Sequence, residues 1–368
     1  DCTLFLYLET LLPRFLSKKL QRLLSSFQPK KTVLNFLINF NARRIINIST
    51  NIVMKWRNLG YFLFTLILPF NKTWGFRVFI NMILFKLYEP MKNHLSFACG
   101  GEAKFYTEPK TIDEFTKTIS ECKKLKRKYF ILGNGTNTLC PDEGYNGVVI
   151  STKALNNILL TKYNDKVFIT LEAGVSLFKL NKLLADLGIE GLEWSYGIPG
   201  SIGGAVFMNA GAYGHDIFEF VDYVVVYSRG KSKKIKKEQI KYSYRNGGLN
   251  GKVVLKVGLK LVCSCPRPIR EKQLYYMKKR IESQPLDYPS AGSVYKRQDK
   301  NIPAEIIDKL GLKGAIIGGA KVSEKHAGFI INTGHATTKN ILDLMEKIEA
   351  KVLLERNIKL EREIKLMS

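Results

Sequence analysis

The chain has 368 residues, of which 45 % are hydrophobic, and a formal net charge of +26 from 58 basic and 32 acidic side chains. This length and apolar content indicate a globular protein with one large core or two to three ordinary ones. The positive charge favours anionic partners such as phosphates, nucleic acid or an anionic membrane. The basic residues are scattered and match no reader motif, which argues against a specialised nucleic-acid surface.

Residues 1–90 differ from the rest, with thirteen Lys and Arg residues against three Asp and Glu residues. Their longest uncharged run, Asn58–Asn71, has fourteen residues and contains a proline, whereas a bilayer span needs about 20. No secretory signal pattern opens the chain, and the six cysteines are too widely spread for a dense disulfide framework. We therefore expect a cytoplasmic protein with a basic, apolar N-terminal extension of unknown role. Contact of this extension with a membrane surface stays open.

From residue 91 onward, short apolar strands alternate with glycine turns and a few helical segments. Leu and Phe recur at three- and four-residue spacing in residues 175–189 up to Gly188, which predicts an amphipathic helix. After a break at "CSCP", residues 268–285 predict a connecting helix that leads to a second domain. β-Branched and aromatic runs predict strands at residues 128–132, 148–152, 166–174, 223–228 and 252–262.

Two glycine-rich loops point to phosphate binding. The first, "GNGTN" at residues 133–137, follows a predicted strand and offers consecutive main-chain N–H groups, an arrangement that binds anions. It has neither the P-loop spacing nor the Rossmann spacing. The second, Tyr196–Gly214, holds six glycines and one proline in nineteen residues. Two such loops could clasp the two ends of a pyrophosphate.

The sequence gives weak evidence for a metal site. Only Cys263 and Cys265 are close together, and no cluster of His, Cys and carboxylate side chains has metal-ligand spacing. We therefore expect no metal.

Several long motifs carry a resemblance to a known family. They include "LGNGTNTL", "GLEWSYGIPGSIGGAVFMNAGAYG", "YSYRNGG", "QPLDYPSAGSVYKR", "GLKGAIIGGAKVSEKHAGFIINTG" and "LEREIKL". In order and spacing, from about residue 91 to residue 368, these motifs resemble the UDP-N-acetylenolpyruvoylglucosamine reductases. The chain looks like the shorter subtype, because the segment between Tyr213 and "YRNGG" leaves no room for an additional substrate loop.

The resemblance implies an α+β fold. It consists of an FAD-binding domain of the p-cresol methylhydroxylase (PCMH) or vanillyl-alcohol oxidase type, made of two α+β lobes, and a C-terminal α+β substrate-binding domain. On this basis we expect the FAD-binding domain at residues 91–265 and the substrate-binding domain at residues 266–368. The implied reaction takes hydride from NADPH through non-covalent FAD to a UDP-sugar enolpyruvyl ether, in peptidoglycan precursor synthesis. No nucleic-acid partner is implied.

The resemblance also implies roles for individual residues. Ser293 matches the family's proton donor, and Arg245 matches the arginine that stabilises the enolate. Glu363 matches the acidic partner, and its neighbour Glu361 is the residue that could most easily be mistaken for it. Lys296 is a candidate for binding the substrate's carboxylate or diphosphate. The FAD-binding candidates are Gly133, Asn134, Gly135, Thr136, Asn137, Gly197, Pro199, Gly200, Ser201, Ile202, Gly203, Asn209, Ala210 and Gly211.

His326 lies in a family motif and is expected to order the domain rather than perform chemistry. Three positions depart from the family pattern: Gly247 stands where the family often has serine, and Ala98 and Cys99 replace a basic and a β-branched residue.

Two other functions stay open. One is a different non-covalent FAD oxidoreductase of the same fold, and the other is a membrane-surface or nucleic-acid-binding protein that acts through residues 1–90.

Overall fold

The computed structural model describes residues 66–68, 77–80, 83–298 and 301–368. Every described residue lies in one compact unit, Phe64–Ser368. The predictions made for residues 1–65 therefore lie outside the described residues.

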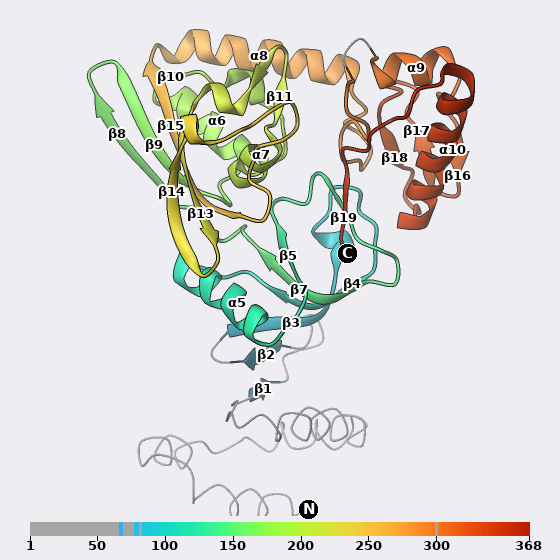
Figure 1. Cartoon of the computed structure of the whole chain (residues 1–368). Helices are drawn as coiled ribbons and strands as arrows, with labels where there is room; N and C mark the ends of the chain where they lie inside the picture. The colour runs from blue at the N-terminus through green and yellow to red at the C-terminus, as the bar shows by residue number, and fades with distance from the viewer. Residues whose placement is uncertain (1–65, 69–76, 81–82, 299–300) are drawn as a thin grey trace, which may run out of the picture. The chain divides into compact units, whose positions relative to one another are not determined.

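The first lobe is built on a six-stranded sheet with the order β1-β2-β3-β4-β7-β5 (Figure 1). The pairs β4–β7 and β5–β7 are parallel, and the other neighbours are antiparallel. Because β3 pairs with β4, residues 83–90 belong to this sheet. The strands are β1 (Leu66–Leu68), β2 (Arg77–Ile80), β3 (Ile83–Pro90), β4 (Glu102–Thr107), β5 (Tyr129–Leu132) and β7 (Tyr145–Ser151).

Helix α5 (Ile112–Lys124) packs against this sheet. It begins after Thr111, whose hydroxyl accepts a hydrogen bond from the main-chain N–H three residues later and so satisfies one free donor of the first turn. Phe115 and Ile119 are four residues apart, lie on one face of the helix and are fully buried in a cluster with Val148. The apolar spacing of α5 thus fixes the face that the sheet covers.

The second lobe is built on a second sheet, with the order β14-β13-β15-β9-β8 and with β10 paired to β15. All its neighbouring strands are antiparallel. The strands predicted at residues 166–174, 223–228 and 252–262 are confirmed here as β9, β13 and β15. The strands are β8 (Ile158–Tyr163), β9 (Lys166–Glu172), β10 (Ile189–Glu190), β13 (Val221–Ser228), β14 (Lys231–Lys236) and β15 (Val253–Cys263).

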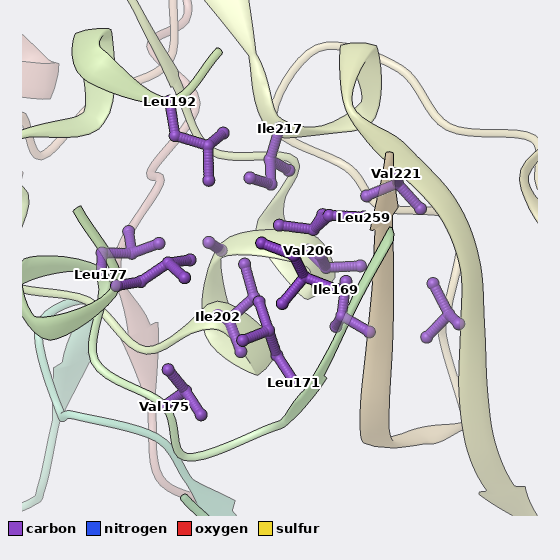
Figure 2. Close-up of a cluster of buried hydrophobic side chains, with 14 of the residues drawn as sticks. Ile169, Leu171, Val175, Leu177, Leu192, Ile202, Val206, Ile217, Val221 and Leu259 are labelled. Atoms are coloured by element: carbon purple, nitrogen blue, oxygen red, sulfur yellow. The ribbon is translucent and has the colours of Figure 1, made fainter. Parts of the chain in front are cut away.

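The core of this lobe lies between the sheet and two helices, α6 (Leu177–Asp186) and α7 (Ile202–Met208) (Figure 2). Ile169 and Leu171 alternate along β9, so both point to the same face of the sheet and are buried against Val206 of α7. The helix predicted at residues 175–189 is confirmed as α6. The loop at residues 197–203 leads into α7 and therefore lies on the side of the lobe that these helices cover.

Helix α8 (Pro266–Ser283) is the long helix predicted after the "CSCP" break. Pro266 stands at its start, where a missing N–H costs nothing. The buried Gln273 donates from Nε2 to the main-chain oxygen of Asn181 on α6, at 2.9 Å. Helix α8 therefore packs on the second lobe before the chain continues into the C-terminal region.

The C-terminal region has its own antiparallel sheet, β16-β17-β18, and its own core. Along α10, Ile341, Leu344 and Ile348 recur at three- and four-residue spacing and are fully buried. With the two lobes, this region forms the α+β architecture that was predicted. Its elements are α9 (Pro303–Lys309), β16 (Ile316–Ile317), β17 (Ala320–Val322), β18 (Ile330–Asn332) and α10 (Thr338–Arg356).

The last residues of the chain return to the first lobe. Strand β19 (Lys365–Leu366) pairs in parallel with β6 (Thr138–Leu139), which directly follows the first glycine loop. The neighbouring Met367 is almost fully buried in the first lobe. This return fixes residue 363 beside the glycine loop at residues 133–137.

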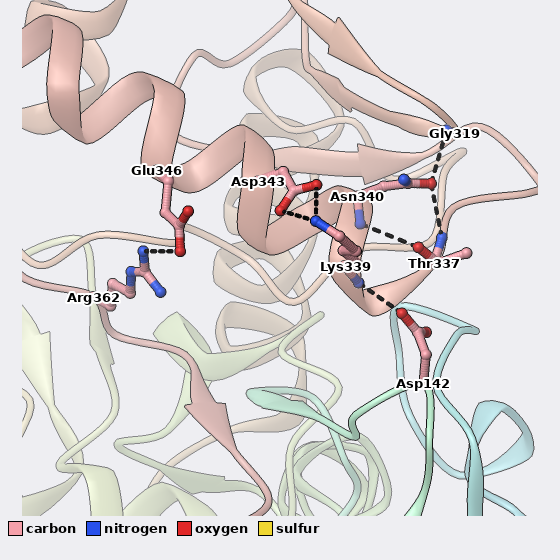
Figure 3. A network of polar contacts seen from close by, with 8 residues as sticks. All are labelled: Asp142, Gly319, Thr337, Lys339, Asn340, Asp343, Glu346 and Arg362. Atoms are coloured by element: carbon pink, nitrogen blue, oxygen red, sulfur yellow. Dashed lines mark hydrogen bonds and ion pairs between the residues drawn. The ribbon is translucent and has the colours of Figure 1, made fainter.

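A carboxylate of the first lobe also binds the start of α10 (Figure 3). Asp142 accepts hydrogen bonds from the main-chain N–H groups of Thr338 and Lys339, each at 2.8 Å. N–H groups in the first turn of a helix have no partner within the helix. We expect Asp142→Ala to lower the free energy of unfolding by about 1–2 kcal/mol, measured by urea denaturation.

The matched control for this prediction is Asp343→Ala, which removes an exposed ion pair with Lys339 four residues away. Such a pair contributes about 0.2–0.5 kcal/mol. Equal losses in the two variants would contradict a stabilising role for Asp142.

Candidate active site

One large cavity brings the predicted site residues together. It has a volume of about 1470 Å³ and is lined by the second lobe, both glycine loops and the C-terminal region. Two of the predicted residues, Ile202 and Lys296, are not among its lining residues. The predicted residues that line it are Gly133, Asn134, Gly135, Thr136, Asn137, Gly197, Pro199, Gly200, Ser201, Gly203, Asn209, Ala210, Gly211, Arg245, Ser293 and Glu363.

The first glycine loop presents free main-chain donors to the cavity. Within the described part of the chain, none of the N–H groups of residues 133–137 donates a hydrogen bond. A Cβ on Gly135 would lie 2.0 Å from the main-chain oxygen of His94, and the φ angle there is +68°, so only glycine fits. Asn134 donates from Nδ2 to the main-chain oxygen of Pro199 at 2.8 Å and ties the two loops together. Such a row of unpaired N–H groups suits phosphate oxygens.

The second loop leads directly into α7. Among the described residues, no acceptor pairs with the N–H groups of Gly200 and Ser201. A Cβ on Gly200 would meet no atom closer than 3.7 Å, so the loop leaves open space at that position. A Cβ on Gly203 would lie 2.7 Å from Cβ of Ala173, which explains the glycine there by close packing of the helix on the second lobe. The glycines of this loop thus serve two purposes, ligand access and packing.

Asn209 ends α7 in the left-handed conformation, with φ of 44°. Its Nδ2 donates to the main-chain oxygen of Ser243 at 3.0 Å and to Oδ2 of Asp216 at 3.3 Å. Its Oδ1 is buried and has no hydrogen-bond partner among the described residues. A buried acceptor without a donor is costly, so this oxygen calls for an N–H or O–H group of a bound ligand.

Arg245 and Glu363 form an ion pair at the cavity wall. Nε of Arg245 lies 3.1 Å from Oε1 of Glu363, although its N–H is not aligned for a hydrogen bond. Arg245 occupies a tight turn in which Ser243 and Asn246 exchange two main-chain hydrogen bonds, and its φ of 54° is unusual for a residue with a side chain. The turn therefore fixes the point at which the Arg245 side chain leaves the main chain.

Burial raises the pKa of Glu363 above its ordinary value, and the nearby charges of Arg245 and Lys296 oppose this shift. Glu363 can therefore hold a proton at a higher pH than an exposed carboxyl group can.

Main-chain pairing joins the segments that carry Ser293 and Glu363. Glu363 donates its N–H to the main-chain oxygen of Val294 at 2.8 Å, so the segments that carry the two side chains run next to each other. Nδ2 of Asn137 donates to the main-chain oxygen of Glu363 at 3.1 Å. The first glycine loop is thus bonded directly to the segment that carries the acidic group.

The two remaining predicted residues have other surroundings. Ile202 is fully buried in the core of the second lobe, and its N–H donates to the main-chain oxygen of Val175 at 2.8 Å. Nζ of Lys296 forms a close ion pair with Glu361. Glu361 therefore lies in a different environment from Glu363, which lines the cavity.

The structure also explains two positions that the sequence pattern left unsettled. A Cβ on Gly247 would lie 2.0 Å from the main-chain oxygen of Val206, so a serine could not be placed here without a shift of the backbone. Nδ1 of His326 accepts a hydrogen bond from the N–H of Gly328 at 3.1 Å, and burial lowers the pKa of His326. His326 is therefore neutral in this arrangement and lines the cavity.

Sequence reasoning missed Tyr213, Arg280 and Gln284, which also line the cavity. Arg280 lies near the end of α8, where its charge resembles the many exposed charges of that helix. No local pattern marked it as buried.

Among the described residues no group of three or more His, Cys, Asp and Glu side chains could hold a metal ion. None of the helices in the described ranges is both long enough and apolar enough to cross a membrane.

Comparison with known proteins decides the family. Residues 284–367 match the model of the UDP-N-acetylenolpyruvoylglucosamine reductase C-terminal domain, and residues 103–234 match that of an FAD binding domain. The chain is 41 % identical over 282 residues to the UDP-N-acetylenolpyruvoylglucosamine reductase of Thermosipho melanesiensis, which covers 76 % of this chain and 94 % of the relative. The chain belongs to the UDP-N-acetylenolpyruvoylglucosamine reductase family.

Other members of the reductase family agree. The enzyme of Clostridium novyi is 40 % identical over 280 residues, which are 75 % of this chain and 90 % of the relative. The crystal structure of the Thermus caldophilus reductase superposes with a TM-score of 0.65 at 28 % identity and covers 83 % of this chain and all of that one. The predicted family and the fold with an FAD-binding domain and a C-terminal domain are confirmed.

Proposed function

We propose that this protein reduces UDP-N-acetylglucosamine enolpyruvate to UDP-N-acetylmuramate in peptidoglycan precursor synthesis, with NADPH and non-covalent FAD. The observation that carries the proposal is the convergence of Arg245, Ser293 and Glu363 with two glycine loops in one cavity. These three residues come from distant parts of a chain that belongs to the reductase family.

The residues present fit FAD. The free N–H groups of residues 133–137 and of Gly200 and Ser201 would hold its diphosphate, and the unpaired Oδ1 of Asn209 would accept from a donor of the cofactor. Bound FAD would supply hydride transfer between NADPH and the substrate, a reaction that side chains alone cannot perform.

The three polar residues fit the second half of the reaction. Hydride addition to an alkene that is conjugated to a carboxylate leaves an enolate-like negative charge, which needs a fixed positive partner and then a proton. We assign charge stabilisation to Arg245 and proton donation to Ser293. Glu363, with its raised pKa, assists the proton transfer or orients the other two groups. We retain Lys296 as a substrate-binding candidate, although a substrate anion would have to compete with Glu361 for it.

Domain division and location complete the proposal. We propose an FAD-binding domain at residues 91–265 and a substrate-binding domain at residues 266–368, after an N-terminal extension at residues 1–90 whose strand β3 (Ile83–Pro90) pairs with β4 of the first lobe. In this division α8 connects the two domains while it packs on the second lobe. We also propose a cytoplasmic location.

A flavin test separates this function from a covalent flavoenzyme of the same fold and from a surface-binding protein. The stretch "ILGNGTNTLC" has no histidine for covalent attachment, so acid precipitation should release all of the yellow flavin into the supernatant. Flavin that stays on the precipitate would favour a covalent oxidoreductase of the same fold. A purified protein with no flavin spectrum, whose liposome or oligonucleotide binding is lost on deleting residues 1–90, would favour a surface-binding role.

A further inference from the structure

A second, smaller cavity lies in the second lobe. It has a volume of about 330 Å³, at the lower end of the range of about 300–1,000 Å³ for small-molecule sites. Strands β10 and β15 and helix α8 contribute to its walls, together with residues 193–194, His215 and Phe220. None of the described residues 133–137 or 196–214 lines it, so this cavity is formed without either glycine loop. His215 also lines the large cavity, so the two cavities adjoin.

Glu193 gives the small cavity a buried acceptor without a donor. The residue lines the cavity, and only 6 % of it is exposed. Its Oε2 accepts a hydrogen bond from the N–H of Gly191 at 3.0 Å. Its Oε1 has no hydrogen-bond partner in the part of the chain that the structure describes. An unpaired buried carboxylate oxygen is costly, and an ammonium group of a ligand would satisfy it with a charge-assisted hydrogen bond.

Trp194 gives the same cavity a buried donor without an acceptor. The residue is 2 % exposed, and its Nε1 has no partner in the described ranges. An indole N–H can only donate, so it calls for an oxygen atom of a ligand. Two lysines, Lys260 and Lys272, also line the cavity, and Nζ of Lys272 lies 3.9 Å from Oε2 of Glu190. A ligand carboxylate would therefore find both an N–H donor and positive charge at this wall.

The rest of the lining is mainly apolar and aromatic. Phe220 comes from the end of a short 3-10 helix, Leu261 and Val262 come from β15, and Tyr276 comes from α8. Such walls favour an apolar group that leaves water on binding. The cavity thus combines an acceptor, a donor and an apolar surface in a small volume.

We propose that this cavity binds a free amino acid with an apolar or aromatic side chain. Its ammonium group donates to Oε1 of Glu193, its carboxylate accepts from Nε1 of Trp194, and its side chain packs against Phe220 and Tyr276. A ligand with only an ammonium group would leave the indole N–H unpaired, and one with only a carboxylate would leave Oε1 unpaired. A zwitterion satisfies both. This site does not depend on the proposed reductase function.

Calorimetry on the purified full chain compares related probes. L-Phenylalanine and L-leucine carry both charged groups, whereas phenethylamine lacks the carboxylate and 3-phenylpropionate lacks the ammonium group. FAD and UDP are present at high concentration to occupy the large cavity. We expect one phenylalanine or leucine to bind per chain, and each truncated probe to bind about 10- to 100-fold more weakly than phenylalanine.

Two variants test the two ends of the ligand separately. Glu193→Gln should weaken the binding of phenylalanine and phenethylamine by about 10-fold and leave 3-phenylpropionate within about twofold. Trp194→Phe keeps an aromatic ring without the N–H, so it should weaken phenylalanine and 3-phenylpropionate and spare phenethylamine. Glu238→Gln is the matched control, because Glu238 is exposed and lines neither cavity. This control should change the binding of no probe.

Failure of both phenylalanine and leucine to bind the unchanged protein would overturn the proposal. Phenethylamine that binds as tightly as phenylalanine would overturn it too, and so would a phenylalanine affinity that neither Glu193→Gln nor Trp194→Phe changes. These measurements follow binding alone at a cavity without glycine-loop residues. A protein without reductase activity can therefore still support or refute the amino-acid site.

Discussion

Ser293→Ala should slow reoxidation of the reduced flavin by the UDP-sugar substrate by about 10²- to 10⁴-fold, because this change removes the group that donates the proton. Flavin reduction by NADPH should stay within about twofold of the unchanged protein, since that step needs no proton from Ser293. Stopped-flow absorbance of the flavin separates the two half-reactions.

Ser290→Ala is the matched control, because Ser290 lines the same cavity on the same segment and has no assigned role. It should leave both rates close to normal. Unchanged reoxidation in Ser293→Ala would eliminate Ser293 as the proton donor.

Arg245→Met should also slow reoxidation, by about 10²- to 10³-fold, because the enolate-like charge loses its fixed cation. A second effect concerns Glu363. Arg245 opposes the burial that raises the pKa of Glu363, so removing this cation should raise that pKa further. The step in the residual rate that depends on Glu363 ionisation should therefore move to higher pH.

The pH profile of flavin reoxidation checks this shift, and Arg245→Lys should keep part of both the rate and the normal profile, because it keeps the charge without the planar donors. A profile in Arg245→Met that stays in place, or that moves to lower pH, would show that the pair at 3.1 Å does not set the ionisation of Glu363.

The sequence predicted the parts of this site that local chemistry determines. The glycines at residues 133–137 and 197–203 predicted main chain without side chains in its way. The structure shows unpaired N–H groups in these loops, and positions where a Cβ would lie too close to neighbouring atoms. The helix at residues 175–189 followed from apolar spacing, and the central strands followed from their β-branched and aromatic content.

Contacts between distant segments could not be predicted in the same way. The bond from Asn137 to the main chain of Glu363 joins residues 226 positions apart, and no local pattern encodes such a pairing. Ile202 follows a glycine loop like its neighbours, yet it belongs to the core because α7 turns that side chain inward. The burial of Arg280 likewise depends on how α8 packs on the second lobe.

One cavity should carry the whole NADPH-dependent reduction of the enolpyruvyl group. The most direct test follows NADPH oxidation by the purified protein with UDP-N-acetylglucosamine enolpyruvate, together with mass analysis of the product. We predict one UDP-N-acetylmuramate formed for each NADPH consumed, and flavin that NADPH bleaches and the substrate recolours under anaerobic conditions. Flavin that NADPH reduces but that the UDP-sugar fails to reoxidise would contradict the proposed reaction.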